Sequence, residues 1–217
     1  MNWETHLPED IRELYDVHEC KHASVILVRE FPELSDEVFD ALRQFRFSAT
    51  DARMPGGSES IIPKKFSRIL RPSGWKEGKL KAKLVLEEQV DGETLDREVS
   101  YDTHKVDYIK GRVAFDLEWN SKDQTFDRDL AAFRTFFDYD KISLGILVTR
   151  SAELESWFRK LGNCLDKDGV ETNNPVYQKY GASTTHMNKL LPRLEAGRAG
   201  GCPVLALGIT RQLVMDG

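Results

Sequence analysis

The sequence predicts an α/β sandwich in which a central mixed sheet, containing an antiparallel meander, is flanked by helices. Two observations indicate this class. Helices come first and a group of short strand-like segments lies between residues 84 and 119, and after this group helices alternate with apolar strands. The sequence contains no internal repeat, linker or low-complexity tract, so we expect residues 1–217 to form a single domain.

The first third of the chain is expected to be mainly helical. Residues 8–19 fit a short helix, and residues 22–30 fit either a buried strand or the end of a helix. Pro32 opens an amphipathic helix that continues to about Phe45. A basic helix is then expected from Ile61 to about Pro72.

The middle of the chain predicts consecutive antiparallel strands. Residues 84–90 and 95–101 fit two strands joined around Asp91-Gly92. Residues 105–119 fit a tight β-hairpin, because Val113, Phe115, Leu117 and Trp119 are apolar at every second position. Lys110-Gly111 suits its two-residue loop, since glycine supplies the positive φ that such turns favour.

This hairpin places three carboxylates on one face. A Lys110-Gly111 loop pairs Tyr108 with Val113 and Asp107 with Ala114, so Asp107 shares a face with Asp116 and Glu118. The diagonal between Asp107 and Asp116 would be roughly 7–8 Å, within reach of one shared metal ion. A solvated outer face of an antiparallel sheet is the simpler alternative.

The last part of the chain alternates helices and apolar strands. We expect helices at residues 125–138, 152–161 and 183–196, strands at 141–149 and 203–209, and a long polar loop at 163–180. Ser183 or Thr184 is expected to cap the last helix. The helix at 125–138 is unusually aromatic, which fits either a core helix or contact with a second subunit.

The composition is that of an ordinary globular protein. With 31 basic and 36 acidic residues, the net charge of −5 argues against a protein that coats nucleic acid without sequence specificity. Cys20, Cys164 and Cys202 fit reduced thiols in an intracellular protein. Neither a signal-peptide pattern nor a membrane-length apolar run is found. His18, Cys20 and His22 lack a second half at zinc-site spacing.

Charge is unevenly distributed around the hairpin. A basic segment with Glu77 as its only acid precedes an acidic one. Its basic residues are Lys64, Lys65, Arg68, Arg71, Lys76, Lys79, Lys81 and Lys83. Three carboxylates form an all-oxygen site that suits Mg²⁺, which can activate water near a phosphodiester. A basic segment beside such a site favours phosphodiester hydrolysis. No Walker loop, dinucleotide fingerprint, serine elbow or zinc motif competes with it.

These residues resemble type II restriction endonucleases of the BglII/BstYI group, which are related to BamHI and belong to the PD-(D/E)XK nuclease superfamily. The resemblance is distributed over most of the chain in consistent order. It is carried by residues 107–118, then by residues 18–45, 74–77, 140–145, 180–183, 197–198 and 203–209. The resemblance implies the restriction-endonuclease-like fold, with activity as a type II site-specific deoxyribonuclease.

The resemblance also implies roles for the hairpin residues. Asp107 would bridge the metal ions, Asp116 would be the second ligand, and the backbone carbonyl of Leu117 would be a further ligand. Glu118 would bind or deprotonate the attacking water. Mg²⁺ would be the cofactor, with Mn²⁺ as a substitute. The sequence departs from the usual pattern twice: Val106 replaces proline and Glu118 replaces lysine.

By the same resemblance the partner is double-stranded DNA, cut at a short palindromic site. The resemblance also suggests a site centred on GATC and places the enzyme in the cytoplasm of a prokaryotic cell. A homodimer would cut both strands, with residues 125–138 as part of its interface. The residues expected to contact DNA are Lys64, Lys65, Asn120, Ser121, Lys122, Ser183, Thr184, Thr185, His186, Asn188 and Lys189. The alternatives are a modification-dependent or repair nuclease of the same fold, and a DNA-binding module that does not cleave.

Overall fold

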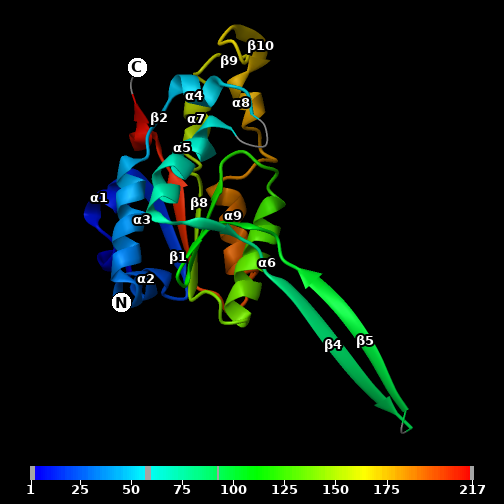
Figure 1. The fold of residues 1–217 in the computed structure, drawn as a ribbon. Coiled ribbons are helices and arrows are strands. Elements are labelled where there is room, and N and C mark those ends of the chain that lie inside the picture. The colour runs from blue at the N-terminus through cyan, green and yellow to red at the C-terminus, as the bar shows by residue number, and fades with distance from the viewer. Residues whose placement is uncertain (1–2, 57–59, 92, 216–217) are drawn as a thin grey trace.

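A six-stranded mixed sheet forms the centre of the computed structural model, which describes residues 3–56, 60–91 and 93–215 (Figure 1). In spatial order its strands are β1 (Tyr15–Cys20), β11 (Val204–Ile209), β8 (Leu144–Arg150), β7 (Val113–Glu118), β6 (Val106–Lys110) and β3 (Lys76–Gly78). Strands β7, β8 and β11 are parallel, whereas β1, β6 and β3 pair antiparallel with their neighbours. The predicted mixed sheet is confirmed. Its antiparallel part is β3–β6–β7, so the meander of consecutive strands expected over residues 84–119 does not form within it, because residues 81–102 pair apart from this sheet.

Helices cover both faces of this sheet. The α-helices of the described residues are α1 (Glu9–Leu14), α2 (Ala23–Glu30), α3 (Pro32–Gln44), α4 (Ala49–Arg53), α5 (Ile61–Leu70), α6 (Thr125–Asp138), α7 (Leu154–Phe158), α8 (Val176–Lys179) and α9 (Met187–Glu195). Helices α2, α3 and α5 lie on one side of the sheet, and α6 and α9 lie on the other (Figure 1). The described part of the chain contains no helix of the length and apolarity needed to span a membrane.

Alternation along the strands divides the core into two apolar clusters. In β7, Phe115 and Leu117 belong to the cluster under α3 and α5, while Ala114 belongs to the cluster under α6 and α9. Strand β8 divides in the same way between Ile146 and Leu147. Both faces of β7 are therefore covered, as is usual for parallel strands within a sheet.

The segment from Lys81 to Asp102 stands apart from the central sheet. Strands β4 (Lys81–Val90) and β5 (Glu93–Asp102) pair only with each other and extend away from the rest of the protein (Figure 1). Two strands were expected here, and the structure lengthens both and places them outside the central sheet. The expected turn includes Gly92, which lies outside the described residues. We call residues 81–102 the arm.

The N-terminal elements correct two expectations. The helix expected over residues 8–19 ends at Leu14, and Tyr15–Cys20 forms the edge strand β1 along β11. The buried Tyr15 hydroxyl donates to the Leu42 carbonyl at 2.9 Å, which fixes the start of β1 against α3. Residues 23–30 are helical, which resolves the alternative in favour of a helix. The amphipathic helix α3 and the basic helix α5 are confirmed.

Two expectations in the C-terminal part are also corrected. The polar loop at 163–180 contains a small sheet of β9 (Asn163–Leu165) and β10 (Glu171–Pro175), followed by α8. Helix α9 begins at Met187, so neither Ser183 nor Thr184 is its N-cap. The Thr184 hydroxyl is engaged elsewhere, because it donates to Gly181 and accepts from Arg150. The remaining short elements are β2 (Phe47–Ser48), β12 (Val214–Met215) and single 3₁₀ turns at Trp3–His6, Arg71–Ser73 and Arg211–Leu213.

Candidate active site

The predicted β6–β7 hairpin forms, but its register differs by two residues from the expected one. Lys110 pairs with Val113 and Tyr108 pairs with Phe115, so the loop is Gly111-Arg112. Gly111 adopts a φ of +55° at the first loop position, which suits a type II′ turn. A shift of two residues keeps every side chain on its predicted face. Continued by one residue beyond the pair of Tyr108 and Phe115, this register sets Asp107 opposite Asp116, where a diagonal neighbour was expected.

Asp107 and Asp116 are fixed by main-chain hydrogen bonds across the two strands. The Asp107 amide donates to Asp116 Oδ1 at 2.6 Å, and the Leu117 amide lies 3.5 Å from Asp107 Oδ2. Each carboxylate therefore accepts a bond from the strand that carries the other. Their geometry is set by the sheet, which is more rigid than a loop.

The carboxylate face is not a solvated outer face. Asp116 is only 2% exposed, because it lies on the side of β7 that α6 and α9 cover. Helix α6 contributes a further acid, Asp129, which is also 2% exposed. Asp129 could not be recognised from the sequence, since one acid in an amphipathic helix is ordinarily solvent-facing. Side-chain oxygens of Asp116, Glu118, Asn120 and Asp129 are buried there without a hydrogen-bond partner.

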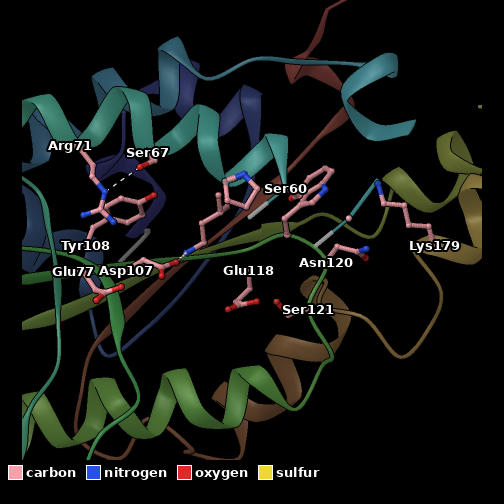
Figure 2. A pocket seen from close by; sticks show the side chains of 14 residues that line it. Ser60, Ser67, Arg71, Glu77, Asp107, Tyr108, Glu118, Asn120, Ser121 and Lys179 are labelled. Carbon is pink, nitrogen blue, oxygen red and sulfur yellow. Dashed lines mark hydrogen bonds between the residues drawn. The ribbon is translucent and has the colours of Figure 1, made fainter. Parts of the chain in front are cut away.

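A pocket of about 520 Å³ opens beside these acids (Figure 2). Asp107 and Glu118 line it together with Arg71, Asn120 and Ser121. Figure 2 shows Arg71 and Tyr108 on one side of the pocket and Glu118 with Ser121 on the other, with Asp107 between them. The Arg71 guanidinium lies 5.0 Å from the centre of the Tyr108 ring and donates to Ser67 at 3.2 Å. The pocket thus combines acids with a basic and a neutral polar rim.

Burial shifts the protonation of the whole acidic group. Burial raises the pKa of Glu118 to about 7, although a side-chain hydrogen bond with Ser121 offsets part of this increase. The pKa of Asp107 is raised chiefly by burial, and the pKa values of Asp116 and Asp129 lie well above the usual range. For Asp116 and Asp129 the neighbouring carboxylates add to the effect of burial. Such a concentration of unneutralised acids is typical of functional sites.

The donor set fits a hard divalent cation. Buried carboxylate oxygens without partners, on Asp116 and Glu118, are the ligand type that Mg²⁺ prefers. Among the described residues no three His, Cys, Asp or Glu side chains form a complete metal-binding cluster. An ion held here would therefore also need main-chain or water oxygens, and Leu117 lies between the two strand acids.

Two of the segments expected to contact DNA lie side by side. The Thr185 amide donates to the Ser121 carbonyl at 2.9 Å, and Asp123 donates to Ser183 at 3.0 Å. Lys122 and Thr184 form an isolated bridge between the segments. Asn120 and Ser121 line the acidic pocket, whereas Ser183 is exposed nearby. The Thr185 side chain is fully buried, so the structure removes Thr185 from the residues that can reach a base edge.

His186, Asn188 and Lys189 line a different cavity, of about 430 Å³. Its floor includes Arg150, which is 3% exposed and donates to the carbonyls of Trp119 and Thr185. Arg150 was missed from the sequence because it ends an apolar strand and carries no motif. It ties the residue that follows β7 to the 183–186 segment.

The basic segment is only partly available to a ligand. Lys65 forms an ion pair with Asp51, so the contact with DNA that is expected of Lys65 would require this pair to open. Lys64 and Arg68 line an open groove with Arg71. Lys79 and Lys83 bind Asp102 and Glu98 at the arm. Two basic residues that were not predicted as site residues from the sequence, Arg71 and Lys179, line the acidic pocket itself.

The aromatic face of α6 serves the fold. Phe126, Leu130, Phe133 and Phe136 are buried in the cluster between the sheet and α9. The excess of aromatic residues therefore no longer supports a subunit interface. Contact through α6 stays a prediction that would involve its exposed residues, which include Arg128, Ala131 and Arg134.

Comparison with known proteins identifies the family of the chain. The family model described as restriction endonuclease BglII/BglIII matches residues 15–209, which contain the whole central sheet and the acidic hairpin. A comparison with curated proteins finds no match. With most of the chain covered by that model, on a mixed sheet that carries three carboxylates at a polar pocket, the chain belongs to the BglII/BglIII restriction endonuclease family.

Proposed function

We propose that this restriction endonuclease hydrolyses double-stranded DNA at a short palindromic site with Mg²⁺ held at Asp107 and Asp116. Family membership supplies the coarser statement, site-specific cleavage of DNA by an enzyme class that is typically metal-dependent. The assignment of the residues, the ion and the type of site is our proposal. Mn²⁺ would substitute for Mg²⁺ in an all-oxygen ligand set.

The observation that carries the proposal is the direct opposition of Asp107 and Asp116. Each carboxylate accepts a main-chain bond from the other's strand, and Asp116 Oδ2 is left buried without a partner. Leaving such an oxygen unsatisfied in the metal-free protein costs free energy. A cation shared by these residues and the Leu117 carbonyl would recover it.

The chain's own groups would then divide the work. Bound Mg²⁺ would supply Lewis-acid polarisation of the phosphoryl oxygen and a more acidic bound water. Glu118 lies on the same face and lines the pocket, where it can orient the attacking water or accept its proton. Arg71 is placed to attract the phosphate into the pocket, and Tyr108 supports its guanidinium.

DNA reading is proposed for the two adjacent segments. Asn120, Ser121 and Lys122 follow the catalytic strand directly, and Ser183 and Thr184 lie against them. His186, Asn188 and Lys189 extend this surface around the second cavity. Lys64, which lies on α5, would bind the DNA backbone. Direct readout needs side chains at base edges, and the amide of Asn120 is suited to adenine.

A homodimer is proposed because a palindromic site presents the same groups twice. Contact through α6 and a GATC-centred sequence are carried over from the resemblance of the chain to the BglII/BstYI group. The cleavage experiment described next tests the sequence, and measurement of self-association tests the contact.

Digestion of a sequenced, unmodified plasmid with Mg²⁺, followed by sequencing of the fragment ends, tests the proposal. We expect discrete fragments whose ends share one palindrome and a constant stagger, and no cutting in EDTA. Random fragmentation, or cutting restricted to modified DNA, would contradict the restriction-site proposal. Undiminished cutting by Asp116→Asn would instead contradict the assignment of the acids.

A further inference from the structure

The arm has one polar and one apolar face. Strands β4 and β5 pair without a bulge from Lys81–Asp102 to Val90–Glu93, so side chains alternate regularly between two sides. One face carries mainly polar residues, such as Lys83 and Glu98, together with Val85. The other carries Leu86, Val90, Leu95 and Val99. We call the second set the apolar face of the arm.

The apolar face is open to solvent. Leu86, Val90 and Leu95 are 45%, 49% and 59% exposed, and the described part of the chain places no helix or strand against them. Antiparallel sheets normally bury one face on a core, and an isolated two-stranded hairpin is only marginally stable in water. An exposed face that gathers several large apolar side chains, here interspersed with Glu88, Glu93 and Arg97, marks an interaction site.

The charge of the arm argues that its partner is not DNA. Residues 81–102 contain three basic and seven acidic side chains, a net charge of −4. A surface of this sign is repelled by the phosphate backbone. The partner is therefore a protein surface that can cover apolar residues.

The root of the arm places it beside α6. His104 lies two residues after the end of β5, and its Nε2 lies 3.9 Å from Asp129 Oδ1 on α6. Leu80, just before β4, packs on the apolar cluster under α6, and three hydrogen bonds join its main chain to Thr103. From this root the arm extends beyond α6 (Figure 1). A second copy that met α6 would lie on the side to which the arm points.

The apolar face also carries charged residues that can pair with those of the same arm in a second, identical chain. Arg97 lies on this face in register with Leu86, while Glu88 and Glu93 lie further toward the tip. In a two-fold contact every pairing occurs twice, so the arginine of each copy can meet a glutamate of the other. The like charges of the two arms are then partly neutralised where they meet.

We propose that the apolar face of the arm packs against a second copy of this chain and forms part of its dimer interface. This rests on the homodimer of the proposed function. It moves the main apolar contact from the aromatic side chains of α6, which are buried within one chain, to the arm.

Sedimentation equilibrium of three proteins tests the proposal: wild type, Leu95→Lys and Val85→Lys. Leu95 and Val85 are equally exposed, at 59%, but lie on opposite faces of the arm. Because a two-fold interface contains each residue twice, we expect Leu95→Lys to raise the dimer dissociation constant roughly a hundredfold. Val85→Lys should change it by about twofold or less.

Leu86→Lys provides an independent repeat on the same face, and far-UV circular dichroism checks that the variants are folded. A wild-type dimer that Leu95→Lys and Leu86→Lys leave intact would overturn the arm contact and leave the dimer proposal standing. A wild type that is monomeric both alone and with a cleavage-resistant plasmid fragment would overturn both. Loss of DNA binding by Leu95→Lys with unchanged self-association would assign the arm to DNA and overturn the proposal.

Discussion

Two hairpins follow each other in this chain and differ in what covers them. The arm and the β6–β7 hairpin both alternate apolar and polar residues around a short turn. In β7 both faces are buried, and the polar face contains Asp116 at 2% exposure. In the arm the apolar face is exposed, with Leu95 at 59%. The same sequence pattern thus gives a concealed acidic site in one place and an open apolar surface in the other.

The difference shows that alternation determines faces and leaves their surroundings undetermined. Strand β7 has β8 on one side and α6 above its acids, so its polar face is desolvated. Carboxylates in such a place are costly unless a cation or proton neutralises them. The arm has no such cover within the described chain, so its polar residues cost little and its apolar residues need a partner.

The largest effect is expected from removing a carboxylate of the covered hairpin. Asp107→Asn should lower Mg²⁺-dependent cleavage by about a thousandfold or more, because it withdraws a proposed ligand while keeping the shape of the side chain. Asp102→Asn, at the exposed root of the arm, is the matched control and should cut within about twofold of wild type. Initial rates of plasmid cleavage measure both. Equal losses would break the distinction between the hairpins.

Stability should separate the hairpins in the same direction. Phe115→Ala should lower the free energy of unfolding by about 3–5 kcal/mol, since its fully buried ring packs against Phe66, Trp75 and Tyr108. Leu86→Ala in the arm should lower it by about 0.5 kcal/mol or less when measured on the monomer. Urea denaturation at low protein concentration checks both values. Comparable losses would mean that the arm is part of the cooperative core.

A smaller effect is expected from pH in the absence of divalent metal. The folded-state pKa of Glu118, about 7, lies above its ordinary value of 4.5, so the folded protein binds its proton more tightly than the unfolded chain. The associated stability is fully present below about pH 4.5 and is lost as pH rises through 7. Asp107, Asp116 and Asp129 shift in the same direction.

Urea denaturation in EDTA at pH 5 and pH 7.5 measures this dependence. Wild type should be less stable at the higher pH, and Glu118→Gln should remove about 1–3 kcal/mol of the difference. An unchanged pH dependence in Glu118→Gln would show that Glu118 does not titrate in this range.

Much of the site could be predicted from the sequence, because a register error of two residues still leaves every side chain on its correct face of the sheet. Lys110-Gly111 and Gly111-Arg112 both fit a two-residue loop, so local turn chemistry did not decide between them. Either choice puts Asp107, Asp116 and Glu118 on one face. Only the structure brings Asp107 directly opposite Asp116.

The remaining errors arise where tertiary contacts override local pattern. Tyr15–Cys20 is short and continues a helical segment, and only pairing with β11 makes it a strand. Asp129 lies on a helix whose apolar stripe predicts burial against a sheet, and nothing local indicates that acids face it there. Thr184 has the chemistry of an N-cap, but its hydroxyl instead accepts a hydrogen bond from Arg150, which is distant in sequence.

The central claim is that the opposed carboxylates of β6 and β7 hold a divalent cation. Titration of Mn²⁺ into the DNA-free protein, followed by loss of the free-ion electron paramagnetic resonance signal, tests it most directly. Wild type should bind Mn²⁺ and release it to excess Mg²⁺, and Asp116→Asn should bind at least about tenfold more weakly. Equal Mn²⁺ affinity of the two proteins would contradict the claim.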